Sequence, residues 1–203
     1  MSKIAPVAAT AFCAALLAAS AWAPAASAKK GPDPLSTNLF ISPPGQPFTA
    51  PGPDPYPVVK WFVRLDSNND GKLDINEFRA DAAYFFGVLD RNHDGFIDSA
   101  EVTYYEQHIV PQVLQPLTGG LDNGSLQRLD RFESDRGAAP YSLFGEPEPV
   151  RSADRQFNYR ITLQEYLDQS DRHFHLLDKD NKGFLTLDDL PQTESEKRTG
   201  SHR

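Results

Sequence analysis

The sequence is almost without cysteine, since Cys13 is the only one among its 203 residues. A single thiol cannot form a disulfide within the chain, so disulfide-stabilised scaffolds are excluded. Cys13 lies inside an apolar run near the N-terminus, and Phe12 before it is larger than a lipoprotein acylation site prefers. The folded part of the chain must therefore rely on core packing, on bound metal, or on both.

Basic residues are also scarce, with 20 lysines and arginines against 28 acidic residues and a net charge of −8. This balance argues against nucleic acid as a partner. It favours a hard cation as a ligand.

Catalytic signatures are absent from the sequence. It has no Gly-x-Ser-x-Gly elbow and no phosphate-binding loop, and its one cysteine lies in the N-terminal run. His173 and His175 are two residues apart, so on a helix they diverge and cannot chelate one ion. His93 is expected to be exposed. We therefore expect that the protein is not an enzyme.

Residues 1–28 contain one basic residue, Lys3, then an alanine-rich apolar run that ends in Ala26-Ser27-Ala28. This layout is typical of a secretory signal peptide that is cleaved after Ala28. Pro24 interrupts the run, which lacks the roughly 20 strongly apolar residues of a bilayer span. We expect an exported protein, periplasmic or secreted, with no membrane span after cleavage.

Two twelve-residue segments carry the chemistry, DSNNDGKLDINE at 66–77 and DRNHDGFIDSAE at 90–101. Each places acidic or amide side chains at positions 1, 3, 5, 9 and 12 and glycine at position 6, where the chain must turn sharply. Position 7 contributes a backbone carbonyl, so its side chain is free to vary. The expected metal ligands are Asp66, Asn68, Asp70, Lys72 (carbonyl), Asp74 and Glu77, then Asp90, Asn92, Asp94, Phe96 (carbonyl), Asp98 and Glu101.

Helical periodicity flanks both segments. Apolar stripes at helical spacing predict core-facing helices, and they consist of Val58, Trp61, Phe62 and Leu65, then Phe78, Ala82, Phe85 and Leu89, then Tyr104, Tyr105 and Ile109 up to Pro111. Only residues 78–89 separate the first two segments. Either one helix is shared between them, or two short helices meet near Gly87.

An internal repeat explains the C-terminal half. Shifting the first half by 88 residues aligns residues 154–165 and 178–189 with the two segments and preserves the apolar positions. The third segment has lost most ligands, and Tyr159 replaces the glycine at position 6, so we expect a structural role without calcium. We expect Ile161 to meet Leu185 across a short β contact, and Tyr166 to pack into the core.

The fourth segment keeps part of the ligand pattern. Lys182 stands at position 5, where an acceptor belongs, but water could take its place if the side chain swings outward. Weak metal binding is expected there, and the candidate ligands are Asp178, Asp180, Phe184 (carbonyl), Thr186 and Asp189.

These segments resemble the calcium-binding loops of the EF-hand superfamily, in particular small exported bacterial EF-hand proteins with closely spaced loops. The resemblance implies a mainly α fold of helix–loop–helix units in two pairs with Pro-rich linkers. The expected organisation is a signal peptide (1–28), a Pro-rich linker (29–55), an EF-hand pair with intact loops (56–110), a linker (111–146), a degenerate EF-hand pair (147–191) and a disordered tail (192–203).

The function that follows is a calcium buffer or sensor, with Ca²⁺ as its cofactor and an unidentified exported protein as a candidate partner. One alternative is a structural or interaction protein whose fold Ca²⁺ stabilises. Another is a lanthanide binder, because exported proteins of the lanmodulin kind share the close spacing and the aspartate at position 9. Those proteins have proline at position 2, where this sequence has Ser67, Arg91, Arg155 and Lys179.

Overall fold

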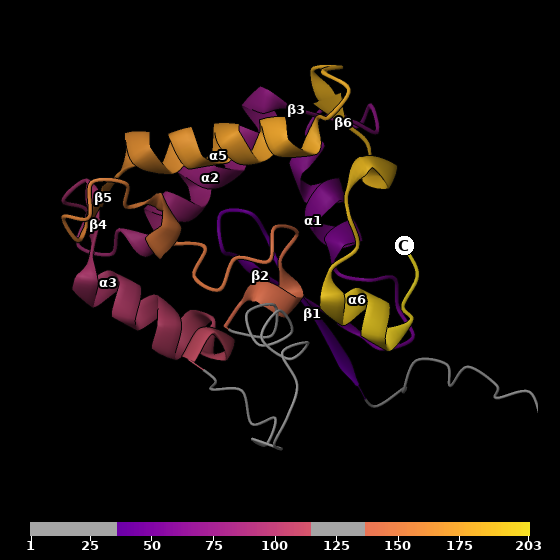
Figure 1. Cartoon of the computed structure of the whole chain (residues 1–203), viewed down its shortest axis with the longest axis horizontal. Helices are drawn as coiled ribbons and strands as arrows, with labels where there is room; N and C mark the ends of the chain where they lie inside the picture. The colour runs from indigo at the N-terminus through magenta and orange to yellow at the C-terminus, as the bar shows by residue number, and fades with distance from the viewer. Residues whose placement is uncertain (1–35, 115–136) are drawn as a thin grey trace, which may run out of the picture.

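The computed structural model describes residues 36–114 and 137–203 (Figure 1). The expected signal peptide lies outside these ranges. The described part is mainly α-helical, and its few strands are short.

The first half is built around one long helix. Helix α1 (Val58–Leu65) leads through strand β3 (Leu73–Asp74) into α2 (Ile75–Leu89), and β4 (Phe96–Asp98) then leads into α3 (Ser99–Tyr104). A π-helical turn, η1 (Tyr105–Ile109), and a 3₁₀ turn, η2 (Pro111–Leu114), follow. Helix α2 is continuous, so the two loops share one helix. The apolar stripes of α1 and α2 are buried as predicted.

The second half repeats this plan. After 3₁₀ turns η3 (Ala139–Tyr141) and η4 (Arg151–Ala153), strand β5 (Arg160–Thr162) leads into α5 (Leu163–Leu177), followed by β6 (Phe184–Leu185) and turn η5 (Leu187–Asp189). Each end of α5 lies 88 residues beyond the corresponding end of α2. The internal repeat is therefore also a structural repeat.

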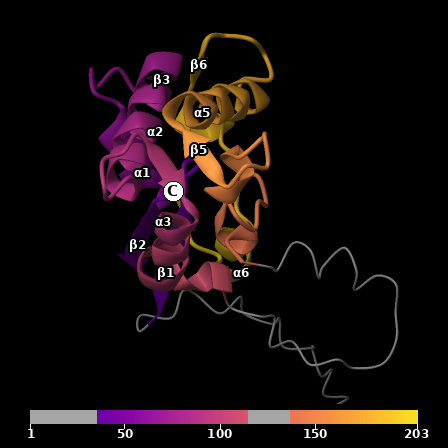
Figure 2. The same cartoon turned by 90° about the vertical axis from the view of Figure 1, so that its left-hand side faces the viewer.

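Helices α2 and α5 lie side by side and run in opposite directions (Figures 1 and 2). Arg79 of α2 donates from Nε to Oδ1 of Asp171 on α5 at 2.6 Å. At one end of the helix pair β3 pairs with β6, and at the other end β4 pairs with β5. Loop 1 (66–77) is thus joined to loop 4 (178–189), and loop 2 (90–101) to loop 3 (154–165).

This pairing corrects the expected contact between Ile161 and Leu185. Leu185 pairs with Leu73, and Ile161 pairs with Ile97. The reason is the length of the shared helices. At about 1.5 Å per residue, a 15-residue helix holds its two loops roughly 22 Å apart. Loops that share a helix cannot pair, and each pairs with a loop from the other half.

A separate hydrophobic core lies under each pair of loops. Beneath loops 1 and 4, the Phe78 ring packs edge-on against Trp61 and Phe174, each at 5.7 Å between centroids. Beneath loops 2 and 3, Phe86 contacts Tyr166 at 5.8 Å, and Tyr166 is 2 % exposed, so its predicted burial is confirmed. Such aromatic pairs add stability beyond the area they bury.

A β-hairpin replaces most of the expected linker at 29–55. Strands β1 (Thr37–Ile41) and β2 (Pro47–Pro51) pair in antiparallel register, and the expectation of a linker is wrong for these residues. Phe40 is fully buried against Trp61, with 5.6 Å between ring centroids. The prolines of β2 stand at its two ends, where an edge strand tolerates a missing N–H donor.

The hairpin turn is held by tyrosines from both halves of the chain. Tyr105 Oη donates to the carbonyl of Gly45 at 2.9 Å, and Tyr166 Oη donates to the carbonyl of Pro44. Phe40 belongs to one core and Ile41 to the other, so the hairpin connects the two ends of the molecule.

The expected disordered tail is also folded. Thr193 caps helix α6 (Glu194–Thr199), which ends at Gly200 in the left-handed conformation. Arg203 donates to both carboxylate oxygens of Glu196, from Nε at 2.8 Å and from Nη2 at 2.9 Å. The tail is held in place by ionic contacts, and for this reason its sequence is polar although it is folded. In the expected linker at 111–146, Ala138 and Ala139 are likewise buried.

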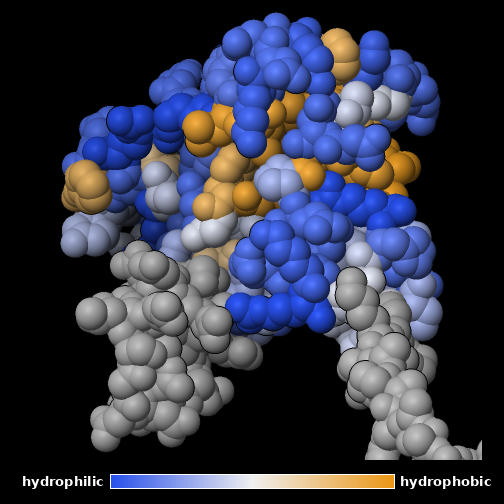
Figure 3. Space-filling model, turned by 45° about the vertical axis from the view of Figure 1, so that its right-hand side comes forward, coloured by the Kyte–Doolittle hydropathy of each residue, from blue (hydrophilic) through white to orange (hydrophobic). Residues whose placement is uncertain are grey.

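Hydrophilic residues cover most of the face drawn in Figure 3, and apolar residues show in the gaps between them. Within residues 36–114 and 137–203, no helix combines the length and the apolar character needed to cross a membrane.

The hairpin turn provides a test of its structural role. Gly45 has φ +100°, and a Cβ built there meets Tyr105 Oη at 2.9 Å. We expect Gly45→Ala to lower the free energy of unfolding by about 1–3 kcal/mol, measured by urea denaturation. The control is Gly87→Ala, because Gly87 lies within α2 with open space around it. This substitution should raise the free energy of unfolding by about 0.5–1 kcal/mol. Equal effects of the two substitutions would show that the hairpin turn carries no special constraint.

Candidate metal centre

Loops 1 and 2 adopt the same backbone path. At position 4, Asn69 and His93 both have φ 59°, and at position 6 Gly71 and Gly95 have φ 75° and 86°. Two left-handed residues so close together wrap the chain tightly around the centre of the loop. A Cβ at either glycine would find nothing within 4 Å, so backbone conformation and not space selects glycine.

The side chains at positions 1 and 3 turn into the loop. Asp66 accepts from the backbone N–H of Asp70 at 3.0 Å and of Gly71 at 2.9 Å, and Asn68 accepts from Asp70 at 2.9 Å. Asp90 and Asn92 make the equivalent bonds in loop 2, at 3.1, 3.0 and 2.9 Å. Oxygen atoms from both positions are thereby oriented by the loop backbone.

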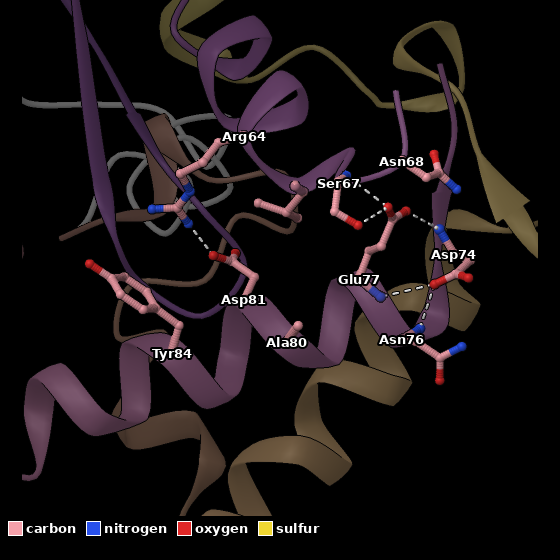
Figure 4. Close-up of a pocket in the computed structure, with 10 residues that line it drawn as sticks. Arg64, Ser67, Asn68, Asp74, Asn76, Glu77, Ala80, Asp81 and Tyr84 are labelled. Atoms are coloured by element: carbon pink, nitrogen blue, oxygen red, sulfur yellow. Dashed lines mark hydrogen bonds and ion pairs between the residues drawn. The ribbon is translucent and has the colours of Figure 1, made fainter. Parts of the chain in front are cut away.

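The side chains at positions 9 and 12 form a capping box at the start of the next helix. Asp74 accepts from the N–H groups of Asn76 at 2.8 Å and Glu77 at 2.9 Å, and Glu77 Oε2 accepts from Asp74 N at 3.1 Å. Glu77 Oε1 accepts from Ser67 N at 2.8 Å, so the carboxylate reaches the beginning of the loop (Figure 4). The helix start thus carries the position-12 ligand over the loop.

Loop 2 repeats this closure in a more buried setting. Glu101 accepts from Arg91 N at 2.7 Å and from Asp98 N at 3.0 Å. Glu101 is only 6 % exposed and Asp90 only 7 %, whereas the corresponding residues of loop 1 are half-buried. The two loops therefore offer the same donors at different depths.

The side chains at position 7 do not enter the loops. Lys72 Nζ lies 4.4 Å from the ring centroid of Phe184 in loop 4, and the Arg160 guanidinium lies 3.9 Å from that of Phe96 in loop 2. Each is a cation–π contact between position-7 residues of paired loops. These contacts leave only the backbone carbonyl of position 7 for a metal.

The donor set fits a hard divalent cation. Each loop contributes four carboxylates and one amide, the oxygen ligands that Ca²⁺ prefers. Within the described ranges, no three acidic, histidine or cysteine side chains already converge as a metal cluster. The carboxylates instead accept bonds from loop N–H groups, which separates their like charges while keeping them on the loop.

Residues 58–80 and 82–102 each match the family model described as EF hand. The chain carries two EF-hands. Its two matched EF-hands are adjacent and closely spaced, and α2 serves both. EF-hand domains indicate calcium binding, and the family is typically non-enzymatic. A comparison with curated proteins finds no match.

Loop 3 of this EF-hand protein keeps the backbone path without the glycine. Phe157 and Tyr159 take φ 53° and 60°, which costs a non-glycine residue about 1 kcal/mol or more at each position. Asp154 accepts from Tyr159 N at 2.8 Å, as its counterparts do in loops 1 and 2. Glu165 Oε2 accepts from Thr162 N at 3.0 Å, but Glu165 Oε1 is buried without a hydrogen-bond partner.

Loop 4 differs from the expected arrangement at position 5. Lys182 does not swing outward: its Nζ donates to both Oδ1 and Oδ2 of Asp189, each at 2.8 Å. The ammonium, together with hydrogen bonds from Thr186, lowers the pKa of Asp189 to about 2. The position-12 carboxylate of this loop is already paired with a cation from its own loop.

A pocket of about 670 Å³ beside loop 1 escaped the sequence reasoning. It lies between α1 and α2 (Figure 4). Its lining is Arg64, Leu65, Ser67, Asn68, Asp74, Asn76, Glu77, Ala80, Asp81 and Tyr84.

A buried carboxylate forms one wall of this pocket. Asp81 accepts from Trp61 Nε1 at 2.9 Å and pairs with Arg64, and burial raises the pKa of Asp81. The sequence did carry one signal of it, because Asp81 interrupts the apolar stripe of α2 between Phe78 and Ala82.

Proposed function

We propose that this EF-hand protein is an exported calcium sensor in which loops 1 and 2 each bind one Ca²⁺. The observation that carries the proposal is the closure of both loops by their position-12 glutamates. Glu77 and Glu101 each accept an N–H from position 2 of the same loop, at 2.8 and 2.7 Å. A carboxylate held there lies opposite positions 1, 3 and 5, as bidentate coordination of Ca²⁺ requires.

The pocket beside loop 1 favours a sensor over a simple buffer. Asp74 and Glu77 belong both to the loop and to the pocket wall, so an ion that draws on Glu77 changes the wall as well. Asp81, which lines the same pocket, accepts a hydrogen bond from Trp61, and the Trp61 side chain belongs to the core. Ion binding at loop 1 is thereby coupled to a surface that a partner can reach.

A second role, in which calcium stabilises the fold, is favoured at loop 2. Asp90 and Glu101 place two nearly buried carboxylates in one loop. Buried negative charges are costly unless a cation or hydrogen bonds compensate them. We therefore assign a regulatory ion to loop 1 and a structural ion to loop 2.

The fluorescence of Trp61 tests this division. Calcium added to the full chain should change Trp61 emission, because the indole N–H bonds Asp81 in the pocket wall. Glu77→Gln should abolish that change, whereas Glu101→Gln should preserve it and instead lower the melting temperature measured in calcium. Trp61→Phe identifies the source of the signal, since Trp22 is the other tryptophan in the chain.

Other ions complete the test. Millimolar Mg²⁺ should displace Ca²⁺ poorly, because it demands a tighter octahedron than a bidentate glutamate provides. A lanthanide that binds many orders of magnitude more tightly and drives a larger structural change would identify a lanthanide protein instead. Loss of nearly all helical circular dichroism in chelator would make both ions structural and remove the sensor role.

A further inference from the structure

Loop 4 contains an ammonium group in contact with its position-12 carboxylate. Lys182 Nζ contacts both oxygens of Asp189 at 2.8 Å, which is a bidentate contact between one cation and the last acidic residue of the loop. In a calcium-loaded EF-hand the metal makes this kind of contact with position 12. Here a side chain of the same loop makes it.

The rest of loop 4 has the same framework as the intact loops. Asn181 and Gly183 take φ 50° and 79°, and Asp178 accepts from the N–H groups of Lys182 and Gly183, each at 2.8 Å. Thr186 donates its N–H to Asp189 at 2.8 Å. The loop therefore reaches an EF-hand shape with hydrogen bonds and an ion pair from its own residues.

A second positive charge stands close to the loop. The ammonium groups of Lys72 and Lys182 lie 4.4 Å and 5.3 Å from the ring centroid of Phe184. A divalent ion in loop 4 would have to displace Lys182 from Asp189 and then remain near both amines. Two ammonium groups beside the loop oppose the binding of a further cation, because like charges repel.

We propose that Lys182 is a built-in cation that takes the place of a metal in loop 4 and keeps this loop in EF-hand form at any calcium concentration. Leu185 of this loop is fully buried and pairs with Leu73 of loop 1. Loop 4 thus keeps a constant shape against loop 1. The sequence predicted weak metal binding by Asp178, Asp180, Phe184, Thr186 and Asp189, and under this proposal these residues bind no metal in the native chain. This inference concerns loop 4 alone and holds whether or not loops 1 and 2 bind calcium.

Lysine replacement provides the test, with calcium as the ligand and native mass spectrometry plus isothermal titration calorimetry as readouts. Lys182→Asp restores an acidic position 5, like Asp70 in loop 1, and should bind one calcium ion more than the native chain. Lys179→Asp changes the net charge equally at the exposed position 2 of the same loop and should bind no extra ion. Lys182→Asn is a milder variant that should also gain the ion.

Stability in chelator gives a second, independent readout. Lys182→Asp and Lys182→Asn should melt at a lower temperature than the native chain in chelator, and calcium should restore the loss. Ion counts equal to the native count in both variants would overturn the proposal, and so would a native chain that loses one ion on Asp189→Asn. If loops 1 and 2 failed to bind calcium, the native chain would hold no ion while Lys182→Asp would still hold one.

Discussion

Replacing Glu77 and Glu101 together with glutamine is expected to remove both calcium ions from the protein. Each substitution exchanges one carboxylate oxygen for an NH₂ group that cannot coordinate, and removes a negative charge from the loop. Changes outside the ligand shell cost a metal site about 10–100-fold in affinity, so loss of a bidentate ligand should weaken each site by roughly 100-fold or more. Calorimetric titration of the full chain measures the loss.

Glutamine keeps the fold comparable in this experiment. Its carbonyl oxygen can still accept one of the N–H bonds that Glu77 and Glu101 receive. The matched control is loop 3, where Asp154→Asn with Glu165→Gln should leave the ion count unchanged. Unchanged binding in the Glu77/Glu101 variant would refute the assignment of the sites. One fewer ion in the loop 3 variant would make loop 3 a working site.

The Ile161→Ala substitution is expected to reduce the stability of the molecule and to weaken calcium binding by loop 2, which lies in the other half of the sequence. Ile161 is 2 % exposed and pairs with Ile97 of loop 2. Truncating such a side chain costs about 2–4 kcal/mol, the range for deleting a buried aliphatic group. Because the two strands support each other, loop 2 should lose affinity while loop 1 keeps it.

Leu185→Ala is the reciprocal variant. Leu185 is fully buried and pairs with Leu73. Its truncation should therefore lower the calcium affinity of loop 1 and leave that of loop 2 unchanged. Each substitution is best made in two backgrounds, Glu101→Gln to isolate loop 1 and Glu77→Gln to isolate loop 2. If Ile161→Ala changed ion binding by loop 4 and left calcium binding by loop 2 unchanged, the result would support pairing of loops 3 and 4 within the C-terminal half.

Local features of the site were readable from the sequence. The loop positions, the helical stripes and the 88-residue repeat all depend on residues close together in the chain, where spacing alone sets which side chains share a face. The structure places the side chains of Asp66 and Asn68 in the loop and those of Asp74 and Glu77 in a capping box. Calcium occupancy of these loops remains a prediction.

Two segments were misread because their order depends on distant partners. The hairpin at 37–51 contains four prolines, yet Tyr105 and Tyr166 hold its turn. The tail is polar, yet Arg203 pairs with Glu196, and the N–H of Tyr56 bonds the carbonyl of His202. Composition predicts extended or disordered chain for both, since it contains no information about these contacts.

The sequence by itself determined the identity of the loops, the apolar helical stripes and the donor set, because a twelve-residue loop and a helical stripe are local objects. The tertiary structure alone decided which loops pair. Two rigid helices of 15 residues, packed in opposite directions, bring loop 1 to loop 4 and loop 2 to loop 3. It also decided that Asp90 and Glu101 of loop 2 are buried, that a pocket adjoins loop 1, and that Lys182 turns onto Asp189. Burial and ion pairing depend on neighbours from the other half of the chain or on rotamer choice within a folded loop, and neither is encoded in residue spacing.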